Sequence, residues 1–152
     1  MFTYLTPYAL AQRFDGFRET PGAVSNPAVL AMLQLVDQSV HDDETPWCSA
    51  FVNYVAWLLD VPRSKSLAAR SWLRVGMAIP LSEARRGFDI VVLSRGANAP
   101  GPAVLNAAGH VGFFAGVLHS PERVQVFGGN QGDKVCLAEF PLDRVLGVRR
   151  LA

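Results

Sequence analysis

The spacing of hydrophobic residues changes about halfway along the chain. In the first half, apolar residues recur at helical intervals, most clearly in residues 44–60, ETPWCSAFVNYVAWLLD. The pattern i, i+4, i+7, i+8, i+11 is formed there by Trp47, Phe51, Tyr54, Val55 and Leu58. This spacing predicts a helix with one apolar face, with Pro46 in its first turn and Pro62 beyond its end.

Three more helices are predicted before residue 77. Residues 7–14 suggest a short helix, and residues 27–36 suggest a second, with Pro27 in its first turn and Asn26 as its N-cap. The third covers LAARSWLRV, residues 67–75, and stops at Gly76. The first half of the chain is therefore expected to be helical.

From residue 87 the apolar residues form short runs rich in β-branched and aromatic side chains, separated by Gly, Pro and Asn. The runs are FDIVVLS, GHVGFFAGVL, RVQVFGG, KVCLAEF and VLGVRR. A long Gly- and Pro-containing loop, residues 95–109, separates the first two. Helices followed by consecutive strands predict an α+β fold, in which helices pack on an antiparallel sheet of about five to six strands.

Length and composition narrow the classes of function. The 152 residues suit a single domain, residues 1–152, and 50% of them are hydrophobic, enough for a core without disulfide bonds. The net charge is +1 and the basic residues are scattered, so a nucleic-acid partner is not expected. No apolar run approaches the roughly 18 residues that span a bilayer, so membrane insertion is not expected either.

A cysteine lies at the start of the helix predicted in residues 44–60. The first turn of a helix presents unpaired N–H groups and the positive end of the helix dipole, and both favour a thiolate at Cys48. A nearby imidazole would complete a thiolate–imidazolium pair. The alternative is a buried core cysteine, which is common. Acidic residues 42–44 would raise the pKa of the thiol if they were close, so we expect them to point away, or to bind substrate or a basic side chain.

Of the three histidines, His110 is the best partner for this thiol. His41 lies in a polar loop and His119 at a predicted hairpin turn, whereas His110 begins a strand. The next strand ends in GGNQGD, which places Asn130 near His110. Its amide oxygen would accept Nδ1–H and leave Nε2 facing the sulfur. The alternatives are a strand-end histidine with a structural hydrogen bond and an asparagine that tolerates a positive φ in a turn.

The remaining cysteine and the scattered histidines suggest no further chemistry. Cys136 alternates with Val135 and Leu137 and is interpreted as a strand packing residue. Three separated histidines do not form a persuasive zinc ligand set, so neither a metal nor another cofactor is expected.

The ordered motifs PWC, GHVGF and GGNQGD resemble those of a phage and bacterial family of small cysteine hydrolases, similar to the NlpC and CHAP groups. The resemblance runs from about residue 10 to the end of the chain. It implies a papain-like α+β fold and cleavage of a peptidoglycan amide, either as an endopeptidase or as an N-acetylmuramoyl-L-alanine amidase. By motif, Cys48 takes the place of the nucleophile, His110 that of the base and Asn130 that of the orienting residue.

Substrate contacts are expected beside these residues. Trp47 precedes the nucleophile and Gln131 follows Asn130, so both are predicted to bind substrate, with the loop at residues 95–109 lining the cleft. For Trp47 a place in the core is an equal alternative. The backbone N–H of Cys48 is the expected first oxyanion donor.

Two further alternatives concern the role of the whole protein. A non-catalytic cell-wall-binding or phage structural module would have the same fold. If the protein is an enzyme, it is expected to be made in the cytoplasm without a signal peptide. It would then act in the periplasm or cell wall, as an endolysin released by a holin or as an exported antibacterial effector. Its expected partners are the peptidoglycan peptide and, for an effector, a cognate inhibitor (immunity) protein.

Overall fold

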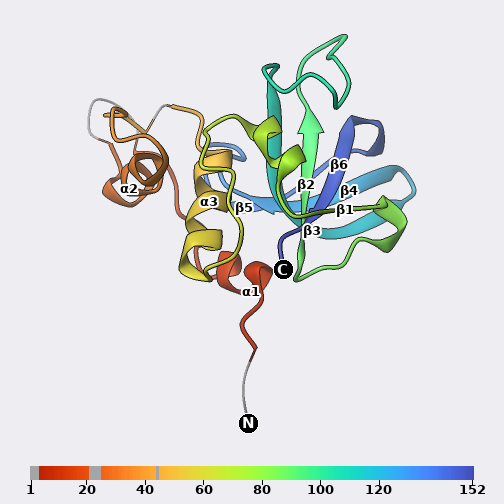
Figure 1. Cartoon of the computed structure of the whole chain (residues 1–152), viewed down its shortest axis with the longest axis horizontal. Coiled ribbons are helices and arrows are strands. Elements are labelled where there is room, and N and C mark those ends of the chain that lie inside the picture. The colour runs from red at the N-terminus through yellow and green to blue at the C-terminus, as the bar shows by residue number, and fades with distance from the viewer. Residues whose placement is uncertain (1–3, 21–24, 44) are drawn as a thin grey trace.

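The structure is a computed structural model that describes residues 4–20, 25–43 and 45–152. It has the predicted α+β organisation, with helices gathered beside a six-stranded antiparallel sheet (Figure 1). The α-helices are α1 (Pro7–Gln12), α2 (Pro27–Val36) and α3 (Cys48–Leu58). Three short 3₁₀ helices are η1 (Ala69–Arg74), η2 (Leu81–Glu83) and η3 (Leu142–Arg144).

The sheet has the strand order β1-β6-β2-β3-β4-β5. Its strands are β1 (Met77–Ile79), β2 (Asp89–Ser94), β3 (Gly109–His119), β4 (Glu122–Gly128), β5 (Cys136–Pro141) and β6 (Val145–Arg150). All five predicted runs are strands. The additional strand β1 pairs with β6 at the edge of the sheet. Pairing between β3 and β4 begins at Phe113 and Phe127, so the first residues of β3 extend past the end of β4.

The observed bounds of the helical segments agree with the prediction for α2 and differ from it in α3 and η1. Asn26 caps α2 as expected, because its side chain accepts a hydrogen bond from the N–H of Ala28 at 2.8 Å. Helix α3 begins at Cys48 and not at Pro46, so Trp47 is its N-cap. The segment predicted as a helix at residues 67–75 is the shorter 3₁₀ helix η1.

Two hydrophobic clusters cover the two faces of the sheet. The larger lies between the sheet and the helices and includes Phe51, Val111 and Phe113. The smaller lies on the other face and includes Phe114, with Phe140 packed against it. Successive residues of β3 therefore contribute to opposite faces, as a strand requires.

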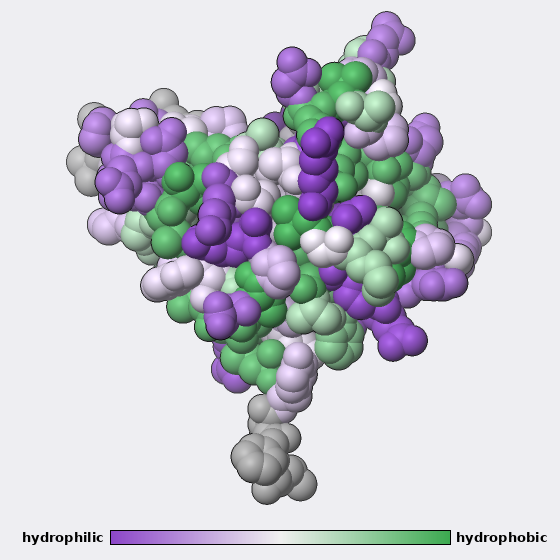
Figure 2. Space-filling model, viewed as in Figure 1, coloured by the Kyte–Doolittle hydropathy of each residue, from purple (hydrophilic) through white to green (hydrophobic). Residues whose placement is uncertain are grey.

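The predicted apolar face of α3 is buried over most of its length. Trp47, Phe51 and Val55 have no exposed surface, whereas Leu58 at the end of the helix is 43% exposed. The surface view shows hydrophilic and hydrophobic areas intermingled, with hydrophilic residues projecting at the rim (Figure 2). Among the described residues no helix has the length and apolar character needed to cross a bilayer.

Candidate functional site

Cys48 lies where the sequence predicts it, at the first residue of α3. Helix α3 contacts β3, and the thiol lies beside the N-terminal end of that strand. The backbone N–H groups of Val111, Ser49 and Cys48 itself lie close enough to favour the thiolate, and each acts to lower the pKa of the thiol. The side chain is only 4% exposed. The sulfur is therefore held in a small, buried cradle of backbone donors.

A buried hydrogen-bond network fixes the first turn of α3. The hydroxyl of Ser49 donates to the carbonyl of Ser66 at 2.6 Å and accepts from the indole N–H of Trp72 at 2.9 Å. One turn later, the Asn53 amide donates to the carbonyl of Ser49 at 2.9 Å and accepts from the N–H of Lys65 at 2.9 Å. These bonds set the position of the neighbouring Cys48.

His110 is the second residue of β3 and is 1% exposed. Its Nε2 lies 2.9 Å from Oε1 of Gln131. The Gln131 Nε2 group donates to the carbonyls of Val126 at 3.2 Å and Cys136 at 2.6 Å, so the amide nitrogen faces those carbonyls and the amide oxygen faces the imidazole. Because this oxygen can only accept, the imidazole nitrogen opposite it carries the proton. Gln131 thus selects the Nε2–H tautomer of His110.

The other nitrogen of the ring is left with a lone pair. Nδ1 of His110 is buried and has no hydrogen-bond partner among the described residues, Cys48 included. A buried polar atom without a partner costs about 1–3 kcal/mol and requires an explanation. A base awaiting a proton from a neighbouring group is one such explanation.

The hydrogen bond expected between Asn130 and Nδ1 is not the one in the structure. Gln131 holds the ring instead, at Nε2, so the predicted roles of the two ring nitrogens are reversed. Asn130 adopts a positive φ of 56° and forms the turn after β4, which was its alternative interpretation. This turn directs the next residue, Gln131, back over β3. The two residues are adjacent in GGNQGD, and the motif alone does not decide between them.

The electrostatics of the site differ from those of the predicted ion pair. Burial raises the pKa of the Cys48 thiol above its ordinary value, against the opposing effects of the N–H groups and of Arg95. Burial also lowers the pKa of His110 to about 4, although the hydrogen bond to Gln131 opposes this. The cations Arg95 and Arg144 lower it further. Near neutral pH, therefore, both groups are uncharged in this conformation.

The acidic residues before α3 are engaged elsewhere. The carboxylate of Asp43 accepts from the N–H groups of Thr20 at 2.9 Å and Asn26 at 2.7 Å. Asp42 accepts from the N–H of Thr45 at 3.1 Å. Neither appears among the groups that shift the pKa of Cys48, in agreement with the expectation that they point away. Residue 44 lies outside the described residues.

The two residues predicted to bind substrate have other partners. Trp47 has no exposed surface, and its indole N–H donates to Glu19 at 2.7 Å, so it is a core residue, as its alternative interpretation stated. Gln131 is 6% exposed and its amide is used by His110 and two carbonyls. Gln131 therefore orients His110 and also lines the hollow beside it, and a contact of either residue with substrate stays a prediction.

A buried arginine that the sequence analysis did not single out holds the loop predicted to line the cleft. Arg70 in η1 has no exposed surface and donates to four carbonyls of that loop. The acceptors are Pro100 at 2.9 Å, Gly101 at 2.8 Å, Val104 at 3.0 Å and Ala108 at 2.9 Å. The loop projects at the top of the view in Figure 1. This one side chain therefore ties four points of the loop together.

A hollow of about 330 Å³ opens beside His110. We call it the His110 pocket; its lining includes Arg95, His110, Asn130, Cys136 and Phe140. Cys136 was predicted to be a strand packing residue, and it is half-buried with its Sγ donating to the Gln131 carbonyl at 3.3 Å. The pocket contains both a base, His110, and a cation, Arg95.

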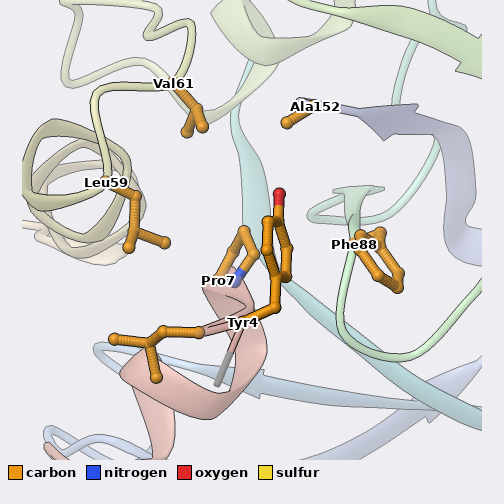
Figure 3. A pocket seen from close by; sticks show the side chains of 7 residues that line it. Tyr4, Pro7, Leu59, Val61, Phe88 and Ala152 are labelled. Carbon is orange, nitrogen blue, oxygen red and sulfur yellow. The ribbon is translucent and has the colours of Figure 1, made fainter. Parts of the chain in front are cut away.

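A second hollow, of about 270 Å³, lies near the C-terminus and is lined by Tyr4, Leu5, Pro7, Leu59, Val61, Phe88 and Ala152. Figure 3 shows aliphatic side chains and two aromatic rings around it. Its described lining includes no cysteine, histidine or carboxylate side chain. It therefore offers none of the acid–base chemistry of the His110 pocket.

Neither a metal centre nor a relative identifies the site further. Within the described ranges, no group of three or more His, Cys, Asp or Glu side chains is placed to hold a metal ion. Comparison of the chain with protein-family models and with curated proteins found no match. The function is therefore argued from the geometry of Cys48 and His110.

Proposed function

We propose that this protein is a cysteine hydrolase of peptidoglycan amides, with a papain-like arrangement in which Cys48 is the nucleophile and His110 the base. The observation that carries the proposal is the free lone pair on the buried Nδ1 of His110. Gln131 fixes that lone pair by holding the opposite nitrogen, and the strand residue after His110 directs its N–H at Sγ of Cys48. The peptidoglycan substrate comes from the motif resemblance.

The neutral site favours general-base catalysis over a resting ion pair. As Sγ attacks the amide carbonyl, the thiol proton passes to Nδ1, which requires the two atoms to come into contact when substrate enters. The S–C bond forms and the carbonyl oxygen becomes an oxyanion. The backbone N–H groups of Cys48, Ser49 and Val111 are the proposed donors for that oxyanion.

The imidazolium then returns its proton to the leaving nitrogen, the C–N bond breaks, and a thioester remains on Cys48. Water, deprotonated by the same Nδ1, hydrolyses the thioester and regenerates the thiol. Gln131 Oε1 accepts from Nε2–H throughout, so it stabilises the transient imidazolium while remaining a positioning residue.

Digestion of purified peptidoglycan, analysed by mass spectrometry, tests the proposal. The wild type is expected to release new termini that identify the bond, whether in the peptide or between muramic acid and L-alanine. In Cys48→Ala and in His110→Gln the rate of peptidoglycan cleavage is expected to fall at least about 100-fold. The matched control His119→Gln changes an exposed histidine at the end of β3 and is expected to retain the rate. Folding of each variant is checked by circular dichroism.

The role of Gln131 has its own readout. In Gln131→Leu the acceptor is removed, so the Nε2–H tautomer is no longer selected. Long-range ¹H–¹⁵N NMR of the histidine ring is expected to show Nε2–H in the wild type and a tautomer mixture in the variant. A wild-type ring protonated at Nδ1 would contradict the mechanism.

A second candidate is a non-catalytic module, which the small exposed fractions of Cys48 and His110, 4% and 1%, also fit. It is favoured if the wild type binds peptidoglycan but releases the same products as Cys48→Ala. For the enzyme, the proposed settings are a phage endolysin and an exported antibacterial effector. Co-purification of a tight inhibitor protein would support the effector.

A further inference from the structure

The His110 pocket carries an excess of positive charge. Arg95 follows β2 immediately, is exposed, and forms no hydrogen bond or ion pair with any described residue. A second guanidinium, that of Arg144, lies over the ring of Phe140 at 5.1 Å. No aspartate or glutamate is among the described residues that line the pocket. An anion placed in the pocket would meet Arg95 and no carboxylate of the described lining residues, although Asp143 acts on the neighbouring Arg144.

The two arginines differ in their freedom to bind. Arg144 donates twice to the carbonyl of Ser94, at 2.9 and 2.8 Å, and so is held in place. Ser94 directly precedes Arg95, so this contact fixes the start of the segment that carries Arg95. All the donors of Arg95 remain available, and a guanidinium presents them in the fork that matches a carboxylate.

The pocket contains the proposed base, and Cys48 is not among its lining residues. It is lined by His110 itself, and the charge of Arg95 reaches both His110 and Cys48. Asn130 lines the same pocket, and its side-chain amide has no hydrogen-bond partner among the described residues.

We propose that the His110 pocket binds a carboxylate of the substrate and that Arg95 is the residue that recognises it. The inference rests on the proposed function and adds a specificity to it: the enzyme selects amides that have a free carboxylate close to the scissile bond. The Asn130 amide supplies a second polar contact to the same substrate group or its neighbour. Charge-assisted pairs of this kind correspond to about a 10- to 100-fold preference.

The kinetic test compares native peptidoglycan with the same material after its carboxylates have been converted to amides by a carbodiimide and ammonia. The wild type is expected to cleave the native material about 10- to 100-fold faster, and Arg95→Gln is expected to lose that preference through KM. Arg74→Gln, which changes an exposed arginine outside the pocket, is the matched control and keeps it. If Arg95→Gln lost the same fraction of the cleavage rate on both substrates, or lost no rate on either, the inference would be overturned.

A binding test separates this inference from the proposed function. Cys48→Ala protein is titrated with N-acetylalanine and with N-acetylalaninamide, and the backbone amide resonances of Gly132 and its neighbours are followed by NMR. N-acetylalanine, which has a carboxylate, is expected to shift these resonances at millimolar concentration, whereas N-acetylalaninamide is not. In the double variant that also carries Arg95→Gln, the shift is expected to be lost. Equal shifts with both probes, or none with either, refute recognition by Arg95 even if peptidoglycan is cleaved. If the probes behave as expected but no wall is cleaved, the carboxylate site stands and the hydrolase proposal fails.

Discussion

The burial of His110 predicts a specific loss of stability in acid. In the folded protein its pKa is lowered to about 4 from an ordinary value of 6.5. Well above pH 6.5 the ring is neutral in both the folded and the unfolded chain and contributes no pH dependence. Between 6.5 and 4 the unfolded chain binds a proton that the folded protein does not, so stability falls as the pH falls.

The size of this loss follows from the same two values. Each pH unit between them changes the free energy of unfolding by at most about 1.4 kcal/mol, so the full interval contributes about 3 kcal/mol. The Cys48 thiol stays neutral over this range because its pKa is raised. His110 is therefore the group of the site that titrates in this window.

Urea denaturation of wild type and His110→Gln at half-unit steps from pH 4 to pH 7.5 measures the effect. Glutamine does not titrate, and all other groups contribute alike to both proteins, so they cancel in the difference. The wild type is expected to lose about 3 kcal/mol more than the variant between pH 7 and pH 4. Parallel profiles would show that the ring titrates normally and would refute the argument from burial.

Three further predictions concern the surroundings of the site. Arg70→Lys keeps the charge but cannot reach four carbonyls, so we expect about 2–4 kcal/mol of destabilisation by urea denaturation and faster proteolysis within residues 95–109. Gly129→Ala is expected to lower the free energy of unfolding by about 1–3 kcal/mol, because the added Cβ would lie 2.7 Å from the Trp47 ring and 2.8 Å from Phe51. The control Gly101→Ala is expected to be near neutral, because its added Cβ would have no heavy atom within 4 Å. Iodoacetamide at pH 8 is expected to label Cys48 more slowly than the half-buried Cys136, because the Cys48 thiol is buried and its pKa is raised. Peptide-resolved mass spectrometry measures the two rates, and faster labelling of Cys48 would indicate the resting ion pair instead.

The hydrophobic pattern predicted the elements that have a clear period. The five runs after residue 87 are strands because their alternation is long enough to mark a pleated surface, and Asn26 was recognised because an N-cap is a local interaction. Strand β1, with three residues, is too short to have a period, and it exists through its pairing with β6. The start of α3 was misplaced by two residues because Pro46 fits both a first turn and the segment before an N-cap.

The site was harder to predict because its properties are tertiary. Cys48 and His110 could be chosen from residue type and order, but not the side chain that holds the imidazole, because the direction of Gln131 depends on the positive φ of its neighbour Asn130. The charge state could not be predicted either. A helix N-terminus favours a thiolate in any sequence, whereas the opposing burial is known only when the packing around the sulfur is known.

The contacts of Arg70 have a consequence for how this fold can change. Every acceptor that the guanidinium uses between residues 100 and 108 is a main-chain carbonyl, which is present whatever side chain the residue carries. The segment can therefore exchange its side chains while its route over the molecule stays the same. Randomised libraries built into it, with Arg70 retained, would vary the rim of the molecule without redesign of the scaffold beneath.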